Sequence, residues 1–466
     1  MEKSGKPSVA IIGGGISGLA AAKELRWLDP VLFEATDSIG GVWRHCSFRS
    51  TRLQTPRPDY EFSDYQWADR NDPTFPTHTE ILEYLHGYAT HFDLWRFIKL
   101  QTKVVEIRFV GQSWTKTGFT HLWGEKGQPI ADGPAWEVGV VTPQSDTVQF
   151  EFLVMCIGKY GDVPNMPTFP RGKGPETFLG KVMHSLDYCK LDDEAAKSLM
   201  KEKKVVIIGS KKSAIDLAVE CAEANHGTYR RGVSRFIESY LTWKLPLEKY
   251  GLKPNHPFVE DYASCQMAIL PETFFAEADE GRIAFKMSSW WCFWEGGVVL
   301  DDNTKLEADV VLLATGFDGK QKLKSLRNAD DEELPSSSHA GFFCSSSVNG
   351  RGTIHPLIPH MAFVGYVESV SNLHTSELRC KWLGRLLRGH FKLPGMEAMF
   401  RQTGAEMEVM KRTTRFYRRH CISTFSINHS DDMCEEMGWS SWRKRSWLAE
   451  LFTAYNNQDY KEDKSQ

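Results

Sequence analysis

The chain has 466 residues, of which 41% are hydrophobic, so it can bury a large core and its length predicts two or three domains. Its 56 basic and 60 acidic residues give a net charge of −4, which excludes a general attraction to nucleic acid or to an anionic membrane. The first apolar run ends in glycines within a few residues, and no run of about 18 apolar residues follows, so we expect neither a signal peptide nor an integral membrane segment.

Ten cysteines are scattered between Cys46 and Cys434 without a CxxC or CxxxxC pair. A chain of this length does not need disulfides to stabilise its core. We therefore expect reduced thiols in a cytoplasmic protein, with no metal site and no dithiol redox centre.

The first predicted elements form a dinucleotide-binding turn. A short apolar strand, Val9 to Ile12, precedes three glycines at GxGxxG spacing and an alanine-rich helix. The first glycine permits the turn, the second lets a pyrophosphate approach the backbone, and the third allows close packing of the helix. We assign cofactor contacts to Gly13, Gly14, Gly15, Ile16, Ser17 and Gly18.

The next apolar strand, "PVLFEA", ends at Glu34, which follows Gly13 by 21 residues. A carboxylate at this position accepts a hydrogen bond from a ribose hydroxyl and repels the extra phosphate of NADP, so this site should bind FAD or NAD. The following "SIGGVWR", with Gly41 and Trp43, resembles the flavin-facing loop of class B flavin-dependent monooxygenases. That resemblance selects FAD, and it places Gln54 near the flavin, where many members carry asparagine.

Between residues 178 and 188 the chain reads "FLGKVMHSLDY". Phe178, Gly180, His184 and Tyr188 match FxGxxxHxxxY, and the stretch resembles the linker signature of flavin-containing monooxygenases. Baeyer–Villiger relatives carry tryptophan in place of Tyr188, so ketone oxygenation is disfavoured. For His184 we favour a role in orienting the linker over proton transfer.

A second strand, turn and helix, "VVIIGSKKSAIDLAVE", keeps Gly209 but has Lys211 and Ala214 where further glycines would fall. Arg230 follows Gly209 by 21 residues and is suited to a ribose phosphate, which predicts NADPH. A plain strand and helix without a ligand remains the alternative. We assign this site to Gly209, Ser210, Lys211, Lys212, Ser213, Ala214 and Arg230, with the two lysines adding positive charge near the pyrophosphate.

The remaining segments resemble the plant branch of flavin-containing monooxygenases that includes pipecolate N-hydroxylases. These segments are "CIGKY", "ADVVLLATGFDG", "RGTIHPLIPHMAFVGYVESVSNLHTSEL", "MKRTTRFYRRHCISTFSI" and "EEMGW". The family usually has a longer stretch after Arg231, and the serine-rich segment 334–350 departs from its pattern. The NADPH domain therefore looks shortened, which puts nicotinamide binding in question.

The predicted fold is α/β, with two Rossmann-like dinucleotide-binding domains. Residues 1–165 begin the FAD domain, 166–330 form the inserted NADPH domain, and 331–466 return to the FAD domain and end in a helical segment. The helix containing Trp439, Trp442 and Trp447 is expected to pack on the core. The resemblance implies a monooxygenase that uses FAD, NADPH and O₂ to oxygenate a soft nitrogen or sulfur of a small molecule, with N-hydroxylation of pipecolate favoured.

Several alternatives stay open. One is a catalytically impaired FAD-binding paralogue or shortened isoform. S-oxygenation, auxin-type oxidative decarboxylation and Baeyer–Villiger chemistry are less favoured. A flavin disulfide reductase would need a redox cysteine pair, and the sequence does not contain an adjacent one.

Overall fold

The computed structural model describes most of the chain. The described residues are 8–111, 129–141, 145–224, 249–250, 252, 260, 265, 270–271, 273–319, 326–328, 352–369, 371–415, 417, 421–422, 426–444, 446–453 and 455–462.

A five-stranded parallel sheet forms the centre of the first unit. Its strands, in spatial order, are β15 (Met361–Phe363), β7 (Phe152–Met155), β1 (Val9–Ile12), β2 (Val31–Phe33) and β3 (Ile98–Lys99). Strand β15 comes from late in the chain and pairs with β7, so the C-terminal part of the chain completes the sheet. The expected return of the chain to the first nucleotide unit thus has a structural counterpart in this pairing.

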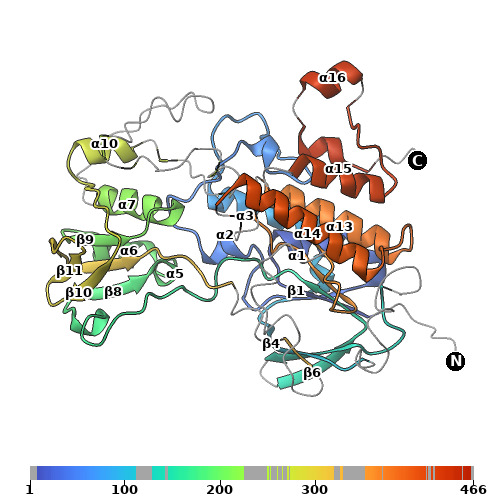
Figure 1. Ribbon diagram of the computed structural model, residues 1–466, viewed down its shortest axis with the longest axis horizontal. Coiled ribbons are helices and arrows are strands. Elements are labelled where there is room, and N and C mark those ends of the chain that lie inside the picture. The colour runs from blue at the N-terminus through green and yellow to red at the C-terminus, as the bar shows by residue number, and fades with distance from the viewer. Residues whose placement is uncertain are drawn as a thin grey trace.

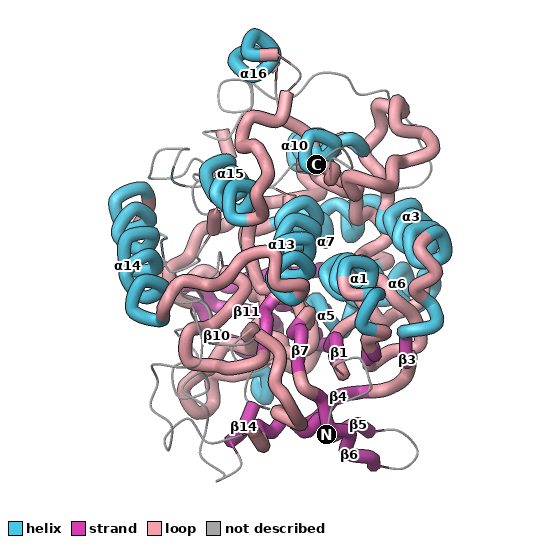
Figure 2. The backbone as a smooth tube through the Cα atoms, turned by 90° about the vertical axis from the view of Figure 1, so that its right-hand side faces the viewer, coloured by secondary structure: helices cyan, strands magenta, loops and turns pink. Residues whose placement is uncertain are grey.

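The continuous apolar run in β1 is explained by burial of both faces of the sheet. Val9 and Ile11 pack in the core beneath the helices, whereas Ala10 and Ile12 pack in a second core against another sheet. Figure 2 shows α1, α13 and α3 on one side of the parallel strands and the second sheet on the other. These helices are α1 (Ile16–Glu24), α3 (His78–His91) and α13 (Asn372–Leu387).

The second sheet has four strands in the order β14, β4, β5, β6. The bounds are β4 (Lys103–Phe109), β5 (Trp136–Val141), β6 (Ser145–Phe150) and β14 (Leu326–Asn328). Trp136 is fully buried between the two sheets, and its ring lies 4.9 Å from that of Phe109. Large aromatic side chains therefore close this face of the first unit.

A second unit lies beside the first, at the left of Figure 1. Its parallel sheet has the order β8, β13, β9. The sheet comprises β8 (Lys181–His184), β13 (Val310–Leu313) and β9 (Val205–Ile208), with an antiparallel sheet of β10 (Trp291–Trp294), β11 (Gly297–Leu300) and β12 (Lys305–Glu307). Its helices are α5 (Ser185–Tyr188), α6 (Asp193–Met200), α7 (Lys212–Ala224) and α10 (Phe274–Asp279).

The C-terminal part adds α14 (Met396–Thr413), α15 (Ser426–Glu436) and α16 (Trp447–Phe452). The expectation that the last tryptophans pack on the core is wrong for two of them. Trp442 is 65% exposed and Trp447 is 62% exposed, while Trp439 packs against the core. The three tryptophans do not share one helix: Trp442 lies in the connection before α16, and Trp447 begins this six-residue helix, which stands apart from the body in Figure 1.

Short helical segments fill the connections. They are α2 (Val42–His45), η1 (Arg26–Leu28), η2 (Arg57–Asp59), η3 (Trp95–Phe97), η5 (Pro175–Thr177) and η9 (Asn457–Tyr460). Within the part of the chain that the structure describes, no helix is both long and apolar enough to cross a bilayer.

One cysteine pair is bonded. Cys265 and Cys421 form a disulfide, with Cα atoms 5.7 Å apart. The expectation that all thiols are reduced is therefore wrong for this pair. The two residues are separated by 156 positions in the sequence, and only the tertiary fold brings them together. The expectation rested on spacing along the chain, which carries no information on such distant pairs.

Candidate nucleotide sites and active site

The first glycine turn lies at the carboxyl end of β1, at the start of α1. Gly13 has φ +107°, and a Cβ there would lie 2.7 Å from the Cys156 carbonyl oxygen. A Cβ on Gly18 would lie 1.8 Å from the Gly13 carbonyl oxygen. The first residue thus needs the conformational freedom of glycine, and Gly18 needs its missing side chain so that α1 can pack on the turn.

Gly15 and Gly41 form an open cradle between two loops. Gly15 is the N-cap of α1, and the nearest atom to a Cβ placed on it would be the Gly41 Cα, at 3.7 Å. Gly41 has φ +57°. These two residues present only backbone atoms to each other, and α1 begins directly after Gly15, where the first N–H groups of a helix have no partner within the helix. The cradle therefore fits the pyrophosphate of a dinucleotide.

Glu34 lies beside the same turn and is 7% exposed. Its Oε2 accepts a hydrogen bond from the Gly14 N–H at 2.7 Å. Its Oε1 accepts from the Thr36 N–H at 2.9 Å and from the Thr36 hydroxyl at 2.7 Å. Each carboxylate oxygen has two lone pairs, so Oε2 keeps the capacity to accept from a ribose hydroxyl. The predicted acid thus lies beside the glycine turn with acceptor capacity left, and its contact with FAD stays a prediction.

The other residues assigned to this site lie around the cradle. The Ser17 hydroxyl is 2.9 Å from that of Ser376 in α13, and Ile16 packs against the main core. The Trp43 indole N–H donates to the Tyr60 hydroxyl at 2.8 Å. Gln54 lies on the exposed connection between α2 and α3. The structure therefore gathers the glycines, Glu34 and the loop containing Trp43, whereas Gln54 is on the surface.

The second turn follows β9 and starts α7. Gly209 has φ +150°, and a Cβ there would lie 2.6 Å from the Ala314 carbonyl oxygen, so glycine is required. The Lys212 ammonium is 2.5 Å from the Asp216 carboxylate, which offsets much of the positive charge expected at the helix start. Ala214 is buried and Ser213 is half-buried, whereas Ser210 and Lys211 are exposed. Arg230 lies outside the described residues.

The linker residues lie between the two turns. A Cβ on Gly180 would lie 2.3 Å from the Phe178 ring and 2.4 Å from the Asp309 carbonyl oxygen. The His184 Nδ1 accepts from the Leu186 N–H at 3.0 Å, and its Nε2 is 3.1 Å from the Gly316 carbonyl oxygen. Nε2 must therefore carry the proton and donate it, and burial lowers the pKa of His184. A neutral imidazole with both nitrogens engaged is suited to orienting the linker.

One functional candidate, Glu220, was not predicted from the sequence, although its partner Tyr188 was. Tyr188 donates from its hydroxyl to Glu220 Oε2 at 2.9 Å, and the Ser50 N–H donates to Glu220 Oε1 at 2.7 Å. Glu220 is only 2% exposed. An acid on the apolar side of α7, between Val219 and Cys221, was the available signal, but its partners could not be identified from the sequence.

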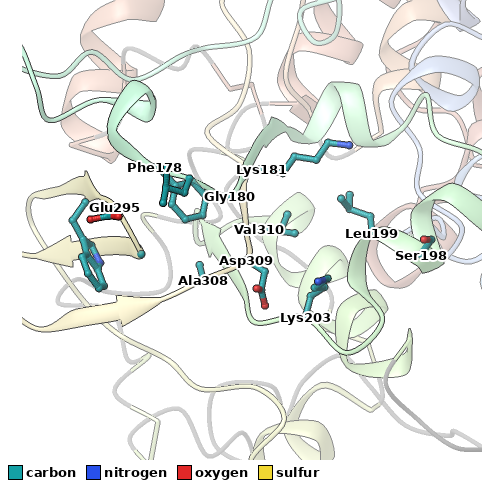
Figure 3. Close-up of a pocket in the computed structure, with 13 residues that line it drawn as sticks. Phe178, Gly180, Lys181, Ser198, Leu199, Lys203, Glu295, Ala308, Asp309 and Val310 are labelled. Carbon is teal, nitrogen blue, oxygen red and sulfur yellow. The ribbon is translucent and has the colours of Figure 1, made fainter.

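A separate cavity of about 670 Å³ lies elsewhere in the second unit. Lys181 and Val310, which line it, are the first residues of β8 and β13, and Ser198 and Leu199 come from α6 (Figure 3). The cavity is therefore at the amino end of the parallel sheet. The turn at Gly209 lies at the carboxyl end, where ligands of such sheets bind, so this cavity is not the nucleotide site.

Comparison with known proteins agrees with this geometry. The family model described as "FMO-like: Flavin-binding monooxygenase-like" matches residues 6–229. The chain is 51% identical over 523 residues to "Probable flavin-containing monooxygenase 1" of Arabidopsis thaliana, covering 99% of this chain and 97% of that protein. It is 52% identical over 450 residues to "Putative flavin-containing monooxygenase 2" of the same plant, covering 92% and 96%.

Solved structures share the fold. S-allyl-L-cysteine S-oxygenase from Allium sativum matches with a TM-score of 0.58 and 21% identity, covering 93% of this chain and 89% of that one. The complex of OTEMO with FAD and NADP matches with a TM-score of 0.65 and 16% identity, covering 90% and 93%. The chain therefore belongs to the flavin-binding monooxygenase-like family and is a flavin-dependent monooxygenase that uses FAD and NADPH.

Proposed function

We propose that the enzyme oxygenates a soft nitrogen or sulfur atom of a small molecule, with N-hydroxylation of a cyclic amine such as pipecolate favoured. FAD, when bound, takes a hydride from NADPH and with O₂ supplies the oxygen atom that is transferred. The chain then has to bind and orient both nucleotides and exclude water. The observation that carries the choice of substrate class is Tyr188, because the Baeyer–Villiger relatives of this linker have tryptophan there.

We propose that FAD is held by the first turn together with Glu34, Gly41 and Trp43, and that NADPH is held by the second turn together with Arg230. The open contact between Gly15 and Gly41 and the remaining acceptor capacity of Glu34 support the first assignment. The constrained turn at Gly209 and the start of α7 support the second. Gln54 remains the candidate near the flavin if its loop closes over the cofactor.

We also propose the domain boundaries predicted from the sequence, with residues 166–330 inserted between the two parts of the FAD domain. Pairing of β15 with β7 supports this division. A cytoplasmic location is part of the proposal. Disulfides such as Cys265–Cys421 are uncommon in the cytoplasm. Titration of free thiols in protein isolated without reductant would test whether the disulfide forms, and an intact disulfide would count against the cytoplasmic location.

Two other candidates rest on specific observations. The alignment with the first Arabidopsis relative extends over 523 residues, which is more than the 466 residues of this chain, so the relative has positions without a counterpart here. If these fall in the NADPH domain after Arg231, the chain is an impaired paralogue. The fold shared with an S-oxygenase supports a thioether substrate as the second candidate.

NADPH oxidation by the purified protein loaded with FAD tests the proposal. We expect consumption of NADPH that a cyclic secondary amine accelerates, with a product heavier by one oxygen atom in mass spectrometry. A thioether amino acid and a cyclic ketone serve as comparison substrates. Acceleration by the ketone alone would refute the assignment to soft nucleophiles, and absence of NADPH oxidation would identify the impaired paralogue.

A further inference from the structure

The two nucleotide units meet at a contact between the loop after α2 and helix α7. Phe48 comes from the first unit, yet it is buried in the core of the second, with its ring 5.8 Å from that of Tyr188. Two residues later, the Ser50 N–H donates to Glu220 Oε1 at 2.7 Å. In Figure 1 the end of α7 reaches the region of α2 and α3. Apolar packing and a hydrogen bond therefore join the units at one place.

Glu220 is the polar centre of this contact. It is 2% exposed, and its second oxygen accepts from the Tyr188 hydroxyl at 2.9 Å. Both donors are uncharged groups, so the buried carboxylate depends on two correctly placed hydrogen bonds. Removal of one partner from such a buried group costs more than the bond itself contributes. A shift of one unit relative to the other would therefore break the hydrogen bond between Ser50 and the Glu220 carboxylate.

The contact is connected directly to both nucleotide turns. Gly41, at the FAD cradle, precedes Ser50 by nine residues through the short helix α2. Glu220 is connected to Lys212, the first residue of α7, through a continuous helix of about 12 Å at 1.5 Å per residue. A movement of the carboxylate relative to Ser50 therefore moves one turn relative to the other.

We propose that Glu220 is a positioning residue for hydride transfer. By holding Ser50 and Tyr188 together, it fixes the nicotinamide nucleotide unit against the flavin unit. The inference rests on the proposed assignment of NADPH to the second turn. Hydride transfer requires the reacting atoms to approach within about 3–3.5 Å, and a misplacement of 1 Å can cost a factor of about 100 in rate.

The chemistry of the contact supplies a matched set of variants. E220A removes both acceptors. E220Q keeps the geometry, because its amide oxygen can accept from Ser50 while the Tyr188 hydroxyl rotates and accepts from the amide N–H. Y188F removes one donor only. D193N is the control, because the Arg49–Asp193 ion pair also joins the units but is 3.9 Å long, and its Asp193 side chain is 68% exposed.

The test has two readouts on FAD-loaded protein. The first is the rate of anaerobic flavin reduction at saturating NADPH, measured together with the NADPH concentration that gives half the limiting rate. The second is amide hydrogen exchange in the peptide that contains Ser50. For E220A we expect a limiting rate about 10- to 100-fold lower, little change in the half-saturating concentration, retained FAD and faster exchange at Ser50. E220Q and D193N should behave like wild type, and Y188F should fall between.

The opposite results overturn the proposal. Reduction of E220A at the wild-type limiting rate would do so, as would an E220Q as slow as E220A, which would point to charge instead of position. If E220A does not fold or loses FAD, Y188F decides, and an unchanged limiting rate in that variant rejects the role. A wild type that NADPH does not reduce would refute the proposed function instead. Exchange at Ser50 still tests the contact in that case, and equal exchange in E220A and wild type rejects it.

Discussion

Substitutions at Gly18 and Gly15 distinguish the packing role of the first glycine turn from its ligand-binding role. A Cβ on Gly18 would lie 1.8 Å from the Gly13 carbonyl oxygen, whereas Cβ contacts under 3.0 Å essentially do not occur, so α1 or the turn must move by more than about 1 Å. The Gly13 carbonyl oxygen is a backbone atom, so it cannot move aside by rotation as a side chain could. We expect Gly18→Ala to destabilise the apoprotein by about 3 kcal/mol, the upper end of the range for overpacking.

Gly15→Ala should behave differently, because its Cβ would meet only the Gly41 Cα at 3.7 Å and the residue has φ −78°. The apoprotein should keep its stability. The added methyl group occupies space that the pyrophosphate needs, so the affinity for FAD should fall by at least about tenfold, or 1.4 kcal/mol.

Thermal unfolding of both apoproteins, followed by tryptophan fluorescence, and titration with FAD check the pair. For 466 residues, the unfolding entropy of about 2.1 cal/mol/K per residue gives about 1 °C per kcal/mol, so Gly18→Ala should lower the midpoint by about 3 °C. An apo Gly18→Ala as stable as wild type would refute the packing argument. Undiminished FAD binding by Gly15→Ala would refute the position of the pyrophosphate.

Three further predictions concern the nucleotides and pH. Glu34→Gln should weaken the binding of FAD by about 1.5–3 kcal/mol, because the amide N–H₂ of glutamine would face either the Gly14 N–H or the Thr36 N–H. Equal affinity of the variant and the wild type for FAD in a titration would contradict this. Arg230→Ala should reduce the preference for NADPH over NADH by about one to two orders of magnitude. Anaerobic reduction of the flavin by each nucleotide measures this preference, and a wild type that uses both nucleotides equally would exclude the contact of Arg230 with the ribose phosphate. Burial lowers the pKa of His355 from 6.5 to about 4, so the unfolded chain binds a proton that the folded one resists, and stability should fall as the pH drops from about 6.5 to 4. His355→Asn should remove up to about 3 kcal/mol of that pH dependence in urea unfolding, and an unchanged slope would show that other groups cause it.

The sequence determined those features whose cause is local. The turn after Ile12 requires glycine because of its backbone angles and the close approach of α1, and the acid at position 34 follows from the length of one strand, helix and strand unit. Such requirements involve residues near one another in the chain, so their spacing is visible without the fold.

Only the tertiary structure decided how distant segments meet. Pairing of β15 with β7 completes the first sheet, and the Cys265–Cys421 disulfide joins residues that no spacing rule connects. The outward position of Trp447 depends on where a six-residue helix is placed. Glu220 reads as one more polar residue on a helix until folding buries it and brings the Ser50 N–H and the Tyr188 hydroxyl to its two oxygens. Burial and partnership of a charged group are properties of the packed molecule, because they depend on distant atoms: Ser50 lies 170 residues and Tyr188 lies 32 residues before Glu220.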